Sequence, residues 1–294
     1  MMTTSALEPS STPNWVELPN KVTGMILERV GALEILKSAQ WVCTTWRRIC
    51  KDPAMWKVIE INYWYLASDK GYDLEKLSKQ AIDRSCGELI DISFNRFCTE
   101  DLLDYVSRCS NKLTRLRVAS FYNVTQWVLN NALKRLPHLE TLEISYISIY
   151  ALDIEAIGRN CPQLKSFTLN TEVDDCYGEV HAIANSMPTL RHLELVGGTV
   201  DPNDMIGTIL NGCPHLESLH VFGCFNLSLD RKLEKLCRER IKNFKFEHHN
   251  IFYEINELYY GRGMDLPEDD GMDGGYGLSG GSAISEEDDY DPAG

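Results

Sequence analysis

The sequence lacks any apolar run that approaches the roughly 18 residues required by a membrane span. It also lacks a basic excess, because 29 Lys and Arg residues stand against 43 Asp and Glu residues, giving a formal net charge of -14. Since phosphate contacts need a basic face, this balance argues against a general binder of nucleic acid or anionic membranes. The first residues have neither the charged start nor the apolar stretch of a signal peptide. We therefore expect a protein of the nucleus or the cytoplasm, with no nucleic-acid or membrane partner.

Motifs of catalysis and metal binding are missing too. There is no G-x-S-x-G, no H-E-x-x-H and no P-loop. The ten cysteines include no C-x-x-C pair, and the group Cys213, His215, His220 and Cys224 does not have the spacing of metal ligands. Without a secretion signal, the cysteines are expected to be reduced thiols that serve as small buried hydrophobes. The sequence predicts no metal, no cofactor and no enzymatic activity of its own.

A short helical module is predicted between residues 18 and 59. Apolar residues at spacings of three and four predict one helix over Lys21 to Val30, a second around Leu33 to Leu36 and a third from Trp41 to Ile49. A unit of about 40 residues is marginally stable alone. Its tryptophans and aliphatic residues exceed what so small a core can cover, and surplus apolar surface indicates an interface.

Four short motifs in this module resemble an F-box. They are Leu-Pro at 18–19, Ile-Leu at 26–27, VCTTW at 42–46 and DPAMW at 52–56, although the first and third are one residue further apart than in the family pattern. The resemblance implies that residues 14–60 bind a Skp-type adaptor and, through it, the cullin scaffold of a ubiquitin ligase. By position, the residues that form or support this interface are Leu18, Pro19, Ile26, Leu27, Ile35, Leu36, Val42, Cys43 and Trp46. The alternative is a helical cap whose apolar residues are all core.

A second pattern recurs about every 26 residues. It reads LTRLRV from Leu113, LETLEI from Leu139, LKSFTL from Leu164, LRHLEL from Leu190 and LESLHV from Leu216. One further step back, GELIDI is expected to retain the pattern through Ile90 and Ile92. The pattern predicts a short strand with its alternate apolar residues directed inwards, followed by a helix, and such units fold by stacking on one another.

These units are leucine-rich repeats. The predicted fold is therefore α/β: a small three-helix F-box followed, over residues 85–247, by a solenoid of about six repeats with parallel strands inside and helices outside. The helix residues expected to face the strands are Leu102, Val106, Leu129, Leu133, Leu136, Ile154, Ile157, Ile183, Ile206 and Ile209.

The cysteines find a place in the repeats. Cys109, Cys161 and Cys213 precede strands at equivalent points, where other units have Leu136 and Met187. An apolar slot is predicted there, and the proline that follows it in four units is expected to end the preceding helix. An F-box followed by degenerate repeats resembles the plant F-box/leucine-rich-repeat proteins, and the resemblance covers residues 14 to about 240.

The strand residues that face away from the core are expected to form a concave surface, which in repeat proteins binds partners. One predicted row consists of Asp91, Arg117, Glu143, Thr168, Glu194 and His220. Arg115 and Arg117 form a basic spot that is predicted to pair with an acidic or phosphorylated segment of a target protein. The full set of candidate substrate-binding residues is Arg115, Arg117, Glu143, His192, Glu194, His220 and Phe222. For any one of them the alternative is a solvated strand face.

The flanking segments are predicted to be a disordered N-terminus over 1–13, a linker with a first helix over 61–84, and a C-terminal cap with an acidic, Gly-rich disordered tail over 248–294. The expected function is a non-catalytic substrate receptor of a Skp–cullin–F-box ubiquitin ligase, with an unidentified protein as its substrate. Two alternatives stay open. One is a repeat scaffold without a ligase role, and the other is a ubiquitin-transferring enzyme, which would need a catalytic cysteine in an exposed basic setting.

Overall fold

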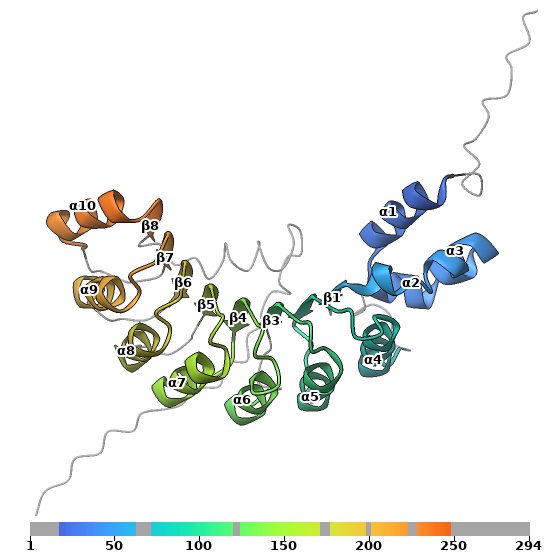
Figure 1. Cartoon of the computed structure of the whole chain (residues 1–294), viewed down its shortest axis with the longest axis horizontal. Helices are drawn as coiled ribbons and strands as arrows, with labels where there is room; N and C mark the ends of the chain where they lie inside the picture. The colour runs from blue at the N-terminus through green and yellow to red at the C-terminus, as the bar shows by residue number, and fades with distance from the viewer. Residues whose placement is uncertain are drawn as a thin grey trace, which may run out of the picture.

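The described part of the chain is a curved α/β solenoid with a helical module at its N-terminal end (Figure 1). A computed structural model describes residues 18–62, 72–119, 124–170, 177–197, 201–222 and 228–247. In these ranges eight parallel strands form one sheet in chain order: β1 (Val58–Asn62), β2 (Asp91–Asn95), β3 (Arg115–Ala119), β4 (Thr141–Ser145), β5 (Ser166–Asn170), β6 (His192–Val196), β7 (Ser218–Phe222) and β8 (Asn243–Glu247). Figure 1 shows the strands on the inner side of the arc and the helices on its outer side, as the repeats predict.

The outer helices connect consecutive strands. They are α4 (Leu74–Arg84), α5 (Glu100–Cys109), α6 (Gln126–Leu133), α7 (Ala151–Asn160), α8 (Tyr177–Ser186), α9 (Pro202–Gly212) and α10 (Arg231–Arg240). The helix residues predicted to face the strands are all at most 1% exposed. Each fully buried aliphatic side chain contributes about 1.5–3 kcal/mol, so the stacked array is stabilised mainly by these contacts.

The N-terminal module consists of α1 (Asn20–Val30), α2 (Ala32–Lys37), a 3-10 turn η2 (Ala39–Trp41), α3 (Thr44–Ile49) and a 3-10 turn η3 (Pro53–Trp56). The single helix predicted from Trp41 to Ile49 is divided at Cys43, whose backbone is extended. The Cys43 thiol accepts a hydrogen bond from the Trp46 amide at 3.5 Å and so caps α3. Gly31 links α1 to α2 with φ +88°, a conformation that other residues rarely adopt.

The register of the first predicted repeat is wrong by two residues. Arg115 follows its neighbour Asp91 by 24 residues, whereas 26 residues separate Glu143 from Arg117. The inward positions of this unit are therefore held by Ile92 and Phe94, which pair with Leu116 and Val118, and not by Ile90 and Ile92. A search for repeats at a constant spacing of 26 residues could not detect this shorter spacing.

The apolar slot before the strands is also shifted in one repeat. Cys161 and Cys213 are buried, as predicted, but Cys109 is exposed. Ser110 takes the slot instead, because its carbonyl accepts the hydrogen bond from Leu113 that the carbonyl of Cys161 accepts from Leu164. The prolines have the predicted effect, since α7, α8 and α9 each end two residues before one.

A single apolar core continues from the helical module into the solenoid. Trp56 and Ile59 are each 1% exposed and Ile61 is fully buried, so the end of the module and the strand β1 share one interior. The predicted linker over 61–84 contains the end of β1 and all of α4, whose N-terminus is capped by Asp73 at 3.0 Å. Within the described ranges, no helix combines the length and the apolar character that crossing a bilayer demands.

Candidate functional site

The first candidate surface lies on the helical module. Of the residues predicted there, Val42 is 62% exposed and Pro19 is also exposed, so both are available to a partner. Leu27, Ile35 and Leu36 are at most 5% exposed and belong to the core, where they support the surface. The remaining four are half-buried at its edge: Leu18, Ile26, Cys43 and Trp46.

Other exposed apolar residues of this module, Val30 among them, were not among the predicted site residues. Trp41 is 61% exposed, Met25 is 54% exposed and Val22 is 41% exposed. The guanidinium of Arg47 lies 4.8 Å from the centroid of the Trp41 ring, which holds the indole at the surface. The sequence signal for Trp41 was its place directly before Val42. We call the set of exposed apolar side chains Val22, Met25, Trp41 and Val42 the module face.

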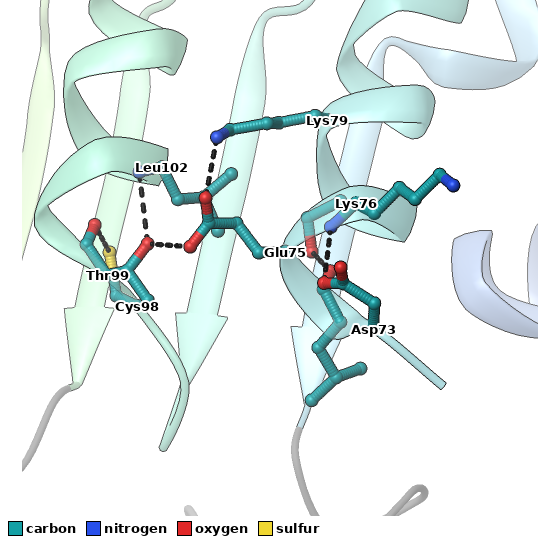
Figure 2. A network of polar contacts seen from close by, with 9 residues as sticks. Asp73, Glu75, Lys76, Lys79, Cys98, Thr99 and Leu102 are labelled. Carbon is teal, nitrogen blue, oxygen red and sulfur yellow. Dashed lines mark hydrogen bonds and ion pairs between the residues drawn. The ribbon is translucent and has the colours of Figure 1, made fainter. Parts of the chain in front are cut away.

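The helix α4 packs against α2 and η3 of the helical module, and polar contacts fix it against α5 (Figure 2). The Glu75 carboxylate accepts hydrogen bonds from Lys79 at 2.6 Å and from the Thr99 hydroxyl at 2.7 Å. Thr99 in turn caps α5 by accepting from the Leu102 amide at 3.1 Å. The hydrogen bonds from Lys79 and then Thr99 lower the pKa of Glu75. The start of the solenoid is therefore anchored to the next repeat.

The second candidate surface is the concave face of the sheet. Its central row, set by the strand register, consists of Glu60, Ser93, Arg117, Glu143, Thr168, Glu194, His220 and Lys245. Asp91, predicted for this row, lies instead beside Arg115 in the neighbouring row, because of the shorter first step. The adjacent rows contain the other two predicted residues, His192 and Phe222.

Both arginines of the predicted basic spot already have acidic partners. Arg115 donates to the Asp91 carboxylate at 3.1 Å. Arg117 forms a bidentate pair with Glu143, with N–O distances of 2.5 and 3.0 Å. An acidic or phosphorylated target segment would have to compete with these two carboxylates, so the predicted role of the arginines stays a prediction.

The other predicted residues gather on β6 and β7. The Nδ1 atom of His220 lies 3.8 Å from the Glu194 carboxylate, and its Nε2 atom lies 3.3 Å from the Ser218 hydroxyl. The His220 ring meets the edge of the Phe222 ring with 5.9 Å between centroids. Burial, followed by the charge of Lys245, lowers the pKa of His220. Burial, followed by the charge of Glu143, raises the pKa of Glu194.

The part of the chain that the structure describes contains no group of three or more His, Cys, Asp or Glu residues arranged to hold a metal ion. The buried cysteines are poorly suited to nucleophilic chemistry, because burial raises the pKa of Cys161 to about 12 and that of Cys213 to about 11. Cys224 and the expected cap from Phe252 to Tyr260 lie outside the described residues.

Comparison with known proteins identifies both halves of this architecture. The family model described as "F-box domain" matches residues 15–58. F-box protein SKIP19 of Arabidopsis thaliana is 38% identical over 298 aligned positions, which cover 98% of this chain and 97% of that protein. F-box/LRR-repeat protein 23 of the same plant is 40% identical over 247 residues, and F-box/LRR-repeat protein 21 is 38% identical over 252 residues.

Coverage of these relatives differs. The aligned region takes in 82% of this chain but 55% of F-box/LRR-repeat protein 23, so the chain spans about half the length of that relative. The alignment with F-box/LRR-repeat protein 21 covers 79% of this chain and 81% of that protein. Relatives covered over most of their length thus include one named as an F-box protein and one named as an F-box/LRR-repeat protein. The chain belongs to the family of F-box/leucine-rich-repeat proteins.

Proposed function

We propose that this protein is a substrate-recognition adaptor of a Skp–cullin–F-box ubiquitin ligase. Its F-box binds a Skp-type adaptor, which brings the cullin, and its concave sheet binds a target protein. One observation carries the proposal: the helical module and the solenoid share one core, and each presents a different surface. The module presents the apolar module face, which includes Val42, and the solenoid presents a polar concave face. The match of residues 15–58 to the F-box domain supports the proposed role in a ubiquitin ligase.

The proposed mechanism is proximity without chemistry by this chain. A target on the concave face and a conjugating enzyme on the cullin become parts of one assembly, which raises the effective concentration of each for the other. The shared core and the anchored α4 suit this task, because a fixed link holds the target at a constant distance from the ligase.

The F-box half of the proposal is tested with a recombinant Skp-type adaptor and the full chain. Val42→Glu and Trp41→Glu place charges in the module face at side chains that are 62% and 61% exposed, so they leave the fold intact. We expect each to weaken adaptor binding by about tenfold or more, measured by calorimetry. Leu152→Glu is the matched control, because Leu152 is 77% exposed on α7, far along the solenoid.

Substitution is a sharper test than deletion of the module. Trp56 belongs to the same core as Ile61, so a chain without its first sixty residues would lose an end of the solenoid as well. Adaptor binding that survives a Trp41→Glu/Val42→Glu double variant would contradict docking through this face. Absence of adaptor binding by the wild-type chain would favour a repeat scaffold without a ligase role.

A further inference from the structure

Charges on the concave face are not evenly balanced. On its N-terminal side, Arg115 is paired with Asp91 and Arg117 with Glu143. These pairs occupy the cations that an acidic ligand would need. Further along the central row, Glu194, His220 and Lys245 are not arranged in such arginine–carboxylate pairs.

Among the described residues of the central row, Glu194, like Glu60 on β1, has no Lys or Arg in ion-pair contact. Among the described residues its ion-pair contact is His220, with 3.8 Å between Nδ1 and Oε2. Because burial lowers the pKa of His220 below its ordinary value of 6.5, the neutral form of this ring is favoured at pH 7, and His220 is not a full positive partner. Lys245 lies on β8, beyond His220, and its charge lowers the pKa of Glu194 less than burial and Glu143 raise it.

Within the described residues, a second acceptor on the same part of the sheet has no hydrogen-bond partner. Asn170 is 4% exposed, and its side-chain oxygen accepts no hydrogen bond. Buried polar atoms are normally satisfied, and leaving one unpaired costs about 1–3 kcal/mol. Asn170 lies two residues after Thr168 on β5, and Thr168 lies between Glu143 and Glu194 in the central row. Side chains two apart on a strand point to the same face.

This part of the face therefore presents acceptors. Thr168 separates two carboxylates by two strand spacings, which amount to about 10 Å. Ammonium and guanidinium groups carry donors and no acceptors, so they complement a carboxylate and an unpaired amide oxygen.

We propose that the concave face recognises its target through a lysine or arginine side chain that docks on Glu194 between Glu143 and His220, with Thr168 and Asn170 as neighbouring polar contacts. This inference rests on the proposed function and names the chemistry of its substrate, a basic segment of a protein. An acidic or phosphorylated segment would be repelled by Glu194. A second copy of the chain is disfavoured by its net charge of -14.

The test is a selection of random peptides by the full chain, with an unphosphorylated library and a matched phosphoserine library. We expect the wild-type chain to enrich peptides that share a Lys or Arg at one position. Glu194→Gln should weaken binding of these peptides by about tenfold, because a charge-assisted contact is lost. Glu155→Gln, on the outer helix α7, makes the same change in net charge and should leave binding unchanged.

Charge reversal makes the test specific. Glu194→Lys should enrich Asp or Glu at the position where wild type enriches Lys or Arg. Enrichment of acidic or phosphorylated peptides by wild type, the absence of any enriched sequence, or equal effects of Glu194→Gln and Glu155→Gln would each overturn the proposal. Binding of the Skp-type adaptor, measured on the same variants, should not change. If the Glu194 variants do not behave as expected but adaptor binding is normal, only this site is refuted. If the wild-type chain does not bind the adaptor, the proposed function is refuted.

Discussion

The guanidinium of Arg84 lies over the indole ring of Trp56, 5.2 Å from the ring centroid. It also donates to the Cys50 carbonyl at 3.3 Å and to the Gln40 side-chain oxygen at 2.7 Å. Arg84 ends the first helix of the solenoid, whereas the other three residues belong to the F-box. One side chain therefore clamps the two parts of the protein together.

Removing this clamp should destabilise the whole chain. We expect Arg84→Ala to lower the free energy of unfolding by about 2–3 kcal/mol, because it removes a cation–π contact and leaves the buried Gln40 without its donor. Arg84→Lys should recover part of the loss, since an ammonium group cannot match the planar fork of arginine. The measurement is urea unfolding followed by circular dichroism.

Arg108→Ala provides the comparison, because Arg108 forms an exposed ion pair with Asp104 on the outer helix α5. Exposed pairs contribute about 0–1 kcal/mol. If Arg84→Ala proved no more destabilising than Arg108→Ala, the contacts of Arg84 would not be what joins the F-box to the solenoid.

Two glycines of α9 should respond oppositely to the same substitution. A Cβ atom on Gly212 would lie 2.3 Å from the carbonyl oxygen of Ala184 on α8, whereas a Cβ atom on Gly207 would meet nothing within 4 Å. Gly212→Ala should therefore force α8 and α9 apart and cost about 2 kcal/mol or more. Gly207→Ala should stabilise the chain by up to about 1 kcal/mol, because alanine favours a helix. Thermal unfolding of both variants measures this difference, and equal shifts would contradict the close helix contact.

Alkylation of the native chain should distinguish exposed cysteines from buried ones. Cys86 and Cys109 are exposed, so N-ethylmaleimide should modify them quickly. Cys161 and Cys213 should stay unmodified, because burial both covers them and raises the pKa of each thiol. Peptide mass spectrometry identifies the modified cysteines. Modification of Cys161 in folded protein at the rate of Cys109 would show that the solenoid opens at this slot.

The periodic features of this fold could be predicted from the sequence because each repeat buries its own leucines. The strands from Leu116 to Leu219 and the helices between them follow from a pattern of inward apolar residues. The shorter step before Arg115 escapes a search at a constant spacing of 26 residues, although Leu89, Ile92 and Phe94 themselves fit the repeat pattern and are buried. That same error moved Asp91 out of its true place beside Arg115.

The two surfaces were harder to predict than the fold. Which F-box residues face outwards depends on how the short helices pack, so the motif grouped the buried Leu27 with the exposed Val42. Arg117 and Glu143 both came from the sequence as site residues, but their bidentate contact depends on side-chain positions across two strands. A count of charges along the chain contains no information on such pairing.

The unbalanced charge at Glu194 predicts a specific dependence of stability on pH. Burial raises the pKa of this carboxyl above its ordinary value of 4.5, so the folded state holds the proton more tightly than the unfolded state does. The stabilising contribution is therefore complete below 4.5 and is lost as the pH rises through the higher folded-state pKa. At pH 7, Glu194→Gln should be more stable than wild type by up to about 1 kcal/mol, a small effect because the side chain is 33% exposed. This advantage should shrink towards about pH 4.

Glu217→Gln is the control of opposite sign. Hydrogen bonds from Lys242 and then Arg191 lower the pKa of Glu217, so its ionised form favours the folded state above pH 4.5. This variant should be less stable than wild type at pH 7, and the difference should close as the pH falls through the lowered pKa. Melting temperatures of both variants between about pH 4 and about pH 7 give the comparison. Shifts of the same sign at pH 7 would mean that Glu194 is already neutralised by a cation of the chain, and the vacancy that a basic target side chain is proposed to fill would not exist.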